Sequence, residues 1–331
     1  MTFEERTGTN AEPYSENLET VVSRYTPEPR IEESYESETE LERDFIARLV
    51  EQGYEQVSIH SEKDLTQNLR KQLERLNGLQ FSDAEWNRFF WDKLSRRSGE
   101  NVATKTERIQ KDSIQTLIRD DGSTEYVRLI DKKNIQNNFL QVTNQYVEPT
   151  GERKRRYDVT ILVNGFPLVH VELKKRGVEL RTAFYQIENY RESSFGEDTG
   201  LFEYVHVFVI SNGTHTRYYS NTTRESALRE RTRYGGQKRK SCSSYEFTTV
   251  WTDADNAPIN DLVDFSKTFF APYTLLTLLT RYCVLTMDKS LLVMRPYQIA
   301  AAERFLHKIK KSLSFGLIGS TKSGGYIWHT T

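Results

Sequence analysis

Two apolar runs joined by Asn164-Gly165 constrain the fold of this chain more than any other feature of its sequence. Residues 156–174 have the sequence RYDVTILVNGFPLVHVELK. Asn-Gly between two apolar runs is the strongest short signal for a tight β-hairpin, because both residues tolerate the positive φ angles that the turn requires. We therefore predict two antiparallel strands, Asp158 to Val163 and Leu168 to Lys174, within a β-sheet.

The second predicted strand has one apolar face and one largely polar face. Successive side chains of a strand point to opposite faces of the sheet. One face carries Leu168, His170, Glu172 and Lys174, and the other carries Val169, Val171 and Leu173. We expect the three apolar residues of the second set to belong to a core, and His170, Glu172 and Lys174 to lie outside it.

The turn brings together two acidic residues that are distant in sequence. Folding the first strand back along the second places Asp158 opposite Glu172 at one end of the pair. Mg²⁺ binds carboxylate and carbonyl oxygens and keeps several of its waters. Such an ion polarises phosphoryl oxygens, and a nearby amine such as Lys174 can orient water or offset charge in the transition state. The layout indicates a metal-dependent phosphodiesterase that cuts nucleic acid.

A helix and a further strand follow the hairpin. Residues 178–194, VELRTAFYQIENYRESS, carry Ala183, Gln186, Ile187 and Tyr190 at helical spacing. Gln186 and Tyr190 are four residues apart and share one helix face, where an ordinary amphipathic helix would carry Leu or Ile. A strand is expected from Val205 to Ser211.

This order of elements resembles the PD-(D/E)xK nuclease superfamily and, within it, the endonuclease and motor (R) subunit of type I restriction enzymes. The segments that carry the resemblance are RYDVTILVNGFPLVHVELKKRG, FVISNGT at 208–214 and LLVMRPYQIAA at 291–301. By resemblance the catalytic set is Asp158, Glu172 and Lys174, supported by Gln186 and Tyr190. Tyr157 stands where the superfamily has its proline, a departure of little consequence.

The resemblance implies an ATP-dependent, site-specific deoxyribonuclease. Asp158, Glu172 and the backbone carbonyl of Leu173 would hold Mg²⁺, and a glutamate of the first helix, here Glu42, can join the metal in this superfamily. A solvated helix carboxylate is the favoured interpretation of Glu42, because no spacing links this residue to the hairpin. In the complete enzyme, ATP-driven translocation would license cutting of double-stranded DNA, and methyltransferase (M) and specificity (S) subunits would read the sequence.

We expect an α/β (α+β) fold: a mixed sheet of PD-(D/E)xK restriction-endonuclease type flanked by helices, followed by the start of a RecA-like helicase domain. An acidic, flexible segment spans 1–36, the endonuclease domain spans 37–265, and the first part of a superfamily 2 motor spans 266–331. The endonuclease domain begins with a capping box at Ser37 to Glu40.

Periodicity predicts the remaining elements. Helices are expected over 65–78, 83–97 and 105–122, and strands over 126–130, 139–147, 216–220 and 247–251. The aromatic residues Trp86, Phe89, Phe90 and Trp91 recur at helical spacing, which favours core packing over stacking on bases.

A helix is also predicted from Pro296, a residue suited to a first helical turn. By resemblance, Gln298 within it would recognise the adenine of ATP through its side-chain amide. Gly319 to Gly325 imitates a phosphate loop, but a strand at 326–328 follows where a helix would be needed. We interpret the chain as an N-terminal fragment that ends before the true phosphate loop.

Charge is unevenly distributed along the chain. The net charge is −1, yet the first forty residues are strongly acidic, so the remainder is basic. The densest basic stretch, 229–240, is either a DNA-backbone contact or a solvated loop. Cys242 and Cys283 lack metal-ligand spacing, and neither an apolar leader nor a membrane-length apolar run is present, which favours a reducing, cytoplasmic location.

Three other interpretations were weighed. His170-Val171-Glu172 matches half of a zinc deaminase motif, but the Pro-Cys-x-x-Cys half is absent. A catalytically silent nuclease fold used for DNA binding or assembly is disfavoured by the intact Asp158, Glu172 and Lys174. A nuclease-helicase of another defence or repair system is disfavoured by the extent of the resemblance, from about residue 38 to 331.

Overall fold

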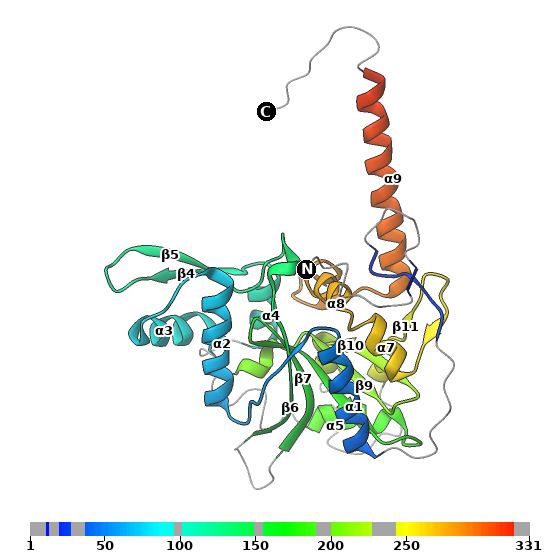
Figure 1. Ribbon diagram of the computed structural model, residues 1–331, viewed down its shortest axis with the longest axis horizontal. Helices are drawn as coiled ribbons and strands as arrows, with labels where there is room; N and C mark the ends of the chain where they lie inside the picture. The colour runs from blue at the N-terminus through cyan, green and yellow to red at the C-terminus, as the bar shows by residue number, and fades with distance from the viewer. Residues whose placement is uncertain are drawn as a thin grey trace.

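A six-stranded mixed sheet forms the centre of the computed structural model, which describes residues 11–12, 20–27, 37–95, 101–148, 155–189, 200–226 and 243–320 (Figure 1). Its strand order is β10-β9-β8-β7-β6-β3. The strands are β3 (Glu55–Gln56), β6 (Leu140–Glu148), β7 (Arg155–Val163), β8 (Phe166–Leu173), β9 (Val207–Ser211) and β10 (Thr216–Ser220). Two pairs, β8 with β9 and β3 with β6, are parallel and the others antiparallel, so the predicted mixed sheet is confirmed.

The predicted hairpin joins β7 to β8. Asn164 and Gly165 have φ angles of 52° and 83°, the positive values that a two-residue hairpin turn requires. The strands pair in the register Val159 with Val171 and Thr160 with His170. Continued by one residue, this register sets Asp158 opposite Glu172, as the sequence predicted.

Gly165 is needed for a close approach as well as for its φ angle. A Cβ atom there would lie 2.6 Å from Leu69 Cα of α2 (Glu62–Asn77). We predict that Gly165→Ala lowers the free energy of unfolding by about 3 kcal/mol, from backbone strain plus the clash. Gly177→Ala is the matched control, since Gly177 has φ +84° with no atom within 4 Å of the added Cβ; it should cost about 1 kcal/mol. Urea denaturation measures both, and equal losses would contradict the close-approach argument.

Helices cover both faces of the sheet. Phe184 of α5 (Leu180–Asn189) packs on Tyr219 with ring centroids 5.0 Å apart. Tyr218 packs on Phe269, at the C-terminal end of α7 (Leu262–Thr268), at 5.1 Å. Because neighbouring residues of β10 point to opposite faces, α5 and α7 lie on opposite sides of the sheet. Helix α1 (Glu38–Glu51) lies against α7 and against β6, β7 and β8.

This double cover corrects one expectation. All eight residues of β8 are buried, including His170 and Glu172, which have no exposed surface. The prediction that these two side chains lie outside the core was wrong, and Lys174, just beyond the strand, is also largely buried. The reason is the position of β8 inside the sheet, parallel to β9, where both faces of a strand are covered.

The N-terminal helices follow the predicted pattern with one exception. Ser37 and Glu40 form the expected capping box of α1, and α2 ends at Gly78 in the left-handed conformation. Helix α3 (Asp83–Phe89) continues into a π-helical turn at Phe90–Leu94. The aromatic residues Trp86, Phe89 and Phe90 are buried as predicted, whereas Trp91 is 55% exposed, so its assignment to the core was wrong.

The helix predicted over 105–122 was wrong beyond its first turns. Helix α4 covers Val102–Gln110, and a separate hairpin follows, formed by β4 (Ile114–Ile118) and β5 (Thr124–Arg128). Asp121 Oδ1 accepts hydrogen bonds from the backbone N–H and hydroxyl of Ser123, which stabilises the connecting turn. The strand expected at 126–130 therefore belongs to this hairpin instead of the central sheet.

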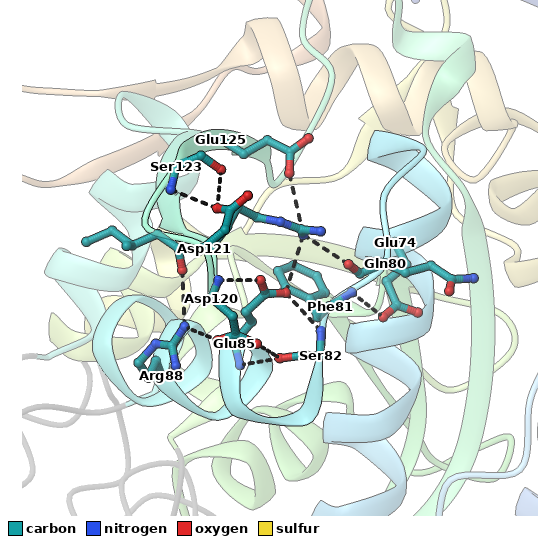
Figure 2. A network of polar contacts seen from close by, with 12 residues as sticks. Glu74, Gln80, Phe81, Ser82, Glu85, Arg88, Asp120, Asp121, Ser123 and Glu125 are labelled. Atoms are coloured by element: carbon teal, nitrogen blue, oxygen red, sulfur yellow. Dashed lines mark hydrogen bonds and ion pairs between the residues drawn. The ribbon is translucent and has the colours of Figure 1, made fainter.

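A buried carboxylate fixes the β4–β5 hairpin to α3 (Figure 2). Glu85 accepts hydrogen bonds from the backbone N–H groups of Ser82 and Asp120, both at 2.9 Å, and lies 3.4 Å from Arg119. Arg88 adds an ion pair with Asp120 at 2.7 Å. The network joins the start of α3 to the end of β4, so the hairpin is held by polar contacts at its turn.

The C-terminal part contains short elements and one long helix. They are β11 (Trp251–Thr252), β12 (Pro258–Ile259), α8 (Pro272–Thr277), β13 (Cys283–Leu285), β14 (Leu291–Val293) and α9 (Pro296–Ser320). The strand expected at 247–251 is reduced to an isolated bridge between Thr249 and Tyr218 and the first residue of β11. In the described residues 266–320 the only strand pairing is that of β13 with β14, so the RecA-like domain and its boundary stay a prediction.

Residues 20–27 of the N-terminal segment lie against the C-terminal helices. Strand β2 (Arg24–Tyr25) in this stretch pairs with β1 (Ala11–Glu12). Tyr25 donates a hydrogen bond to Asp264 of α7 at 2.7 Å, and Thr20 donates one to Glu303 of α9.

Among the helices of the described residues, none has the length and apolar character needed to cross a membrane.

Candidate functional site

Strands β7 and β8 bring Asp158, Glu172 and Lys174 together at one end of the hairpin. Lys174 Nζ lies 3.0 Å from Glu172 Oε1 and 2.8 Å from the carbonyl oxygen of Leu173. Asp158 Oδ2 accepts a hydrogen bond from the backbone N–H of Leu173 at 2.8 Å. The structure thus gathers the three predicted charged residues and the predicted carbonyl around the last residues of β8.

Burial makes this charge cluster electrostatically demanding. Glu172 has no exposed surface and Lys174 is 7% exposed, whereas Asp158 is only partly buried. Burial, reinforced by the negative charge of Glu172, raises the pKa of Asp158 to about 7. Two carboxylates in a poorly solvated place repel each other, and a cation between them would relieve that repulsion.

The oxygen atoms present fit a hard divalent cation. Glu172 Oε1 and the Leu173 carbonyl oxygen both contact the Lys174 ammonium, so these two oxygens already converge on one positive charge. Within the described residues, no group of three or more His, Cys, Asp or Glu side chains could hold a metal. The candidate donors at the end of the hairpin are two carboxylates and a carbonyl, ligand types that suit an ion such as Mg²⁺ that keeps several waters.

Helix α1 directs two glutamates at this end of the sheet. Glu42, the predicted extra metal ligand, is buried, and its Oε1 accepts hydrogen bonds from Asn144 Nδ2 at 2.6 Å and Gln145 Nε2 at 3.0 Å. Glu38, one turn earlier, lies with Oε1 4.0 Å from Lys174 Nζ. Glu38 was not among the predicted site residues, although its spacing of four residues from Glu42 places both on one helix face.

The remaining candidate residues are Gln186 on α5 and several residues outside the described part of the chain. Gln186 is half-buried, beside the buried Ala183 and Ile187. Tyr190, the basic stretch 229–240 and Cys242 lie outside the described residues, so their assignments stay predictions.

Gln298 occupies the first turn of α9. Its side chain is exposed, and Oε1 accepts a hydrogen bond from the backbone N–H of Arg295 at 2.9 Å, which caps the helix. Recognition of adenine by this amide stays a prediction. Of the segment that imitates a phosphate loop, Gly319 and Ser320 end α9, and residues 321–331 lie outside the described part of the chain.

Comparison with known proteins gives a consistent result. The family described as "Type I restriction enzyme R protein N terminus" matches residues 35–227, a range that contains the whole central sheet and the Asp158–Lys174 cluster. The chain is 44% identical over 311 residues to the type I restriction enzyme EcoprrI endonuclease subunit of Escherichia coli, covering 93% of the chain and 94% of that protein.

More distant relatives are longer. The chain is 37% identical over 303 residues to the type I restriction enzyme SsaAORF53P endonuclease subunit of Staphylococcus saprophyticus, covering 90% of the chain but 29% of that protein. A similar match, 37% over 305 residues, is found to the SauMSSORF170P endonuclease subunit of Staphylococcus aureus, again covering 29% of its length.

Proposed function

Because this chain belongs to the family of type I restriction enzyme R proteins, we propose that its Asp158, Glu172 and Lys174 hydrolyse DNA phosphodiester bonds with bound Mg²⁺. The observation that supports this most directly is the contact of one ammonium group, that of Lys174, with both Glu172 Oε1 and the Leu173 carbonyl, close to Asp158. An ordinary ion pair between Lys174 and Glu172 would need neither the second carboxylate, that of Asp158, nor the Leu173 carbonyl.

The residues divide the chemistry between them. Asp158, Glu172 and the Leu173 carbonyl would hold the ion, which when bound polarises a phosphoryl oxygen and lowers the pKa of its water. Lys174 contacts these oxygens in the metal-free chain, and with the ion in that place its ammonium would stand beside the reacting centre and stabilise negative charge that develops on the phosphate. The buried β8 strand holds these groups in place before substrate arrives.

The activity of the complete enzyme forms the second part of the proposal. The chain spans less than a third of the staphylococcal endonuclease subunits that it matches. We propose that cutting of double-stranded DNA is coupled to ATP-driven translocation, and that methyltransferase and specificity subunits supply sequence recognition. Under this division of labour the chain alone is inactive or only nicks DNA weakly.

Lys174→Met tests the site against Lys175→Met. Lys174 contacts the cluster, whereas the side chain of its neighbour Lys175 is exposed. In the complete enzyme assembly with Mg²⁺, Lys174→Met should lower the rate of plasmid cleavage by about 10²- to 10³-fold, the loss typical for removing one group that stabilises transition-state charge. Lys175→Met should cut at nearly the wild-type rate.

Two results would overturn the proposal. Cleavage by Lys174→Met protein at the wild-type rate would remove this residue from the reaction. Undiminished cleavage by the wild-type enzyme in excess chelator would show that the reaction does not need a divalent metal ion. Defined double-strand cuts by the chain alone would leave the chemistry intact but contradict the proposed dependence on the other subunits.

A further inference from the structure

The two oxygens of the Glu172 carboxylate have different neighbours. Oε1 lies 3.0 Å from Lys174 Nζ, while Oε2 lies 3.6 Å from Nε2 of His170. Neither Glu172 nor His170 has any exposed surface. Since both side chains are buried in the metal-free chain, the orientation of this carboxylate depends on the protein groups around it.

Packing fixes the orientation of the His170 ring. His170 pairs with Thr160 of β7 and lies beside Phe208 of β9. Its ring centroid is 5.3 Å from that of Tyr157 and 6.2 Å from that of Phe208, and both contacts are nearly perpendicular. The imidazole therefore packs between two aromatic rings, with its Nε2 facing Glu172.

Nε2 of His170 is the ring nitrogen that faces Glu172 Oε2. A ring nitrogen that carries hydrogen attracts a carboxylate oxygen, whereas a lone pair would repel it, so we assign the hydrogen to Nε2. The distance of 3.6 Å is longer than a hydrogen bond, and a movement of about 0.5 Å would close it, as polar contacts in active sites do on loading.

We propose that His170 is a positioning residue for the metal-binding carboxylate of Glu172. The Nε2–H group of His170 would hold Oε2 of Glu172 in place. Oε1 of the same carboxylate then stays directed at the position that the Lys174 ammonium occupies in the metal-free chain, where the cation would bind. The inference rests on the proposed function of the site. Losing a group that hydrogen-bonds the far side of a metal ligand typically weakens metal binding by about 10- to 100-fold.

Calcium binding to the full chain, measured by titration calorimetry, tests this role without catalysis. His170→Leu keeps bulk but removes the donor, and we expect Ca²⁺ affinity to fall by about 10- to 100-fold. His170→Gln restores an N–H donor and should bind within about threefold of the wild type. In the wild type, ¹⁵N NMR of the imidazole should show hydrogen on Nε2.

His206→Leu is the matched control for buried-histidine packing. His206 is equally buried, and its Nδ1 lies 2.6 Å from the Tyr204 carbonyl oxygen instead of near a carboxylate. We expect this variant to lose stability while keeping wild-type Ca²⁺ affinity. A purely structural role for His170 would change melting temperature in both leucine variants and affinity in neither.

The outcomes separate the positioning role from the function of the site. Wild-type affinity in His170→Leu, or equal losses in the Leu and Gln variants or in His206→Leu, would overturn the positioning role while the metal site stands. If the wild-type chain itself binds no divalent cation, both this inference and the proposed function fail.

Discussion

Replacing Asp158 by asparagine is expected to lower DNA cleavage by about 10³-fold or more while making the metal-free chain more stable at pH 8. The lost carboxylate is one of the two that would hold the cation. The ionised form of the same carboxylate destabilises the metal-free fold, since burial and the charge of Glu172 raise the pKa of Asp158 to about 7. Asparagine can still accept the hydrogen bond that Leu173 N–H donates to Oδ2, so the local geometry survives.

Cleavage, Ca²⁺ binding and urea denaturation would be measured on Asp158→Asn and on a control, Asp253→Asn. Asp253 is also buried and accepts backbone hydrogen bonds, from Asp255 at 2.9 Å and Ala257 at 2.8 Å, but it lies outside the charge cluster. The control should cut and bind Ca²⁺ like the wild type. An Asp158→Asn protein that is less stable than the wild type at pH 8, or that retains cleavage, would show that the carboxylate is a structural group.

The hairpin was predictable because local chemistry decides it. Asn164-Gly165 sets the turn and pairs Val163 with Phe166. That register alone would set Asp158 opposite Val171, and a register shift between Ile161 and Leu162, which the sequence did not predict, brings Asp158 opposite Glu172. Helix α1 was predictable for the same reason, since its capping box is contained in four residues.

The errors arose where tertiary structure overrode a local pattern. Ile114, Leu117 and Ile118 have the spacing of a helix, but Gly122 with φ +84° and the turn around it fold this segment into a hairpin, with Leu117 buried and both isoleucines exposed. Burial of His170 could not be predicted from alternation within one strand, because the helix that covers that face comes later in the chain. Contact of Glu38 with Lys174 likewise requires knowing how α1 crosses the sheet.

The raised pKa of Asp158 also sets the direction of a pH effect on stability. A carboxyl group with a pKa of about 7 in the folded chain and 3.8 as its ordinary value binds its proton more tightly when folded. Its stabilising contribution is complete below pH 3.8 and is lost as pH rises through 7, which amounts to about 4 kcal/mol. His170 and His206 act in the opposite direction, because burial lowers the pKa of each to about 4 and their stabilising effect is lost as pH falls.

Because of these opposing groups, the effect of Asp158 must be measured as a difference between the wild type and Asp158→Asn. We predict that the metal-free wild type loses about 4 kcal/mol relative to the variant between pH 4 and pH 8. Ligation requires the ionised carboxylate, so Ca²⁺ binding should release roughly 0.9 proton at pH 6 and roughly 0.1 at pH 8. Calorimetry in buffers of different ionisation enthalpy measures this release. A release that does not depend on pH would mean that Asp158 is already ionised before the cation binds, and a constant stability difference would lead to the same conclusion.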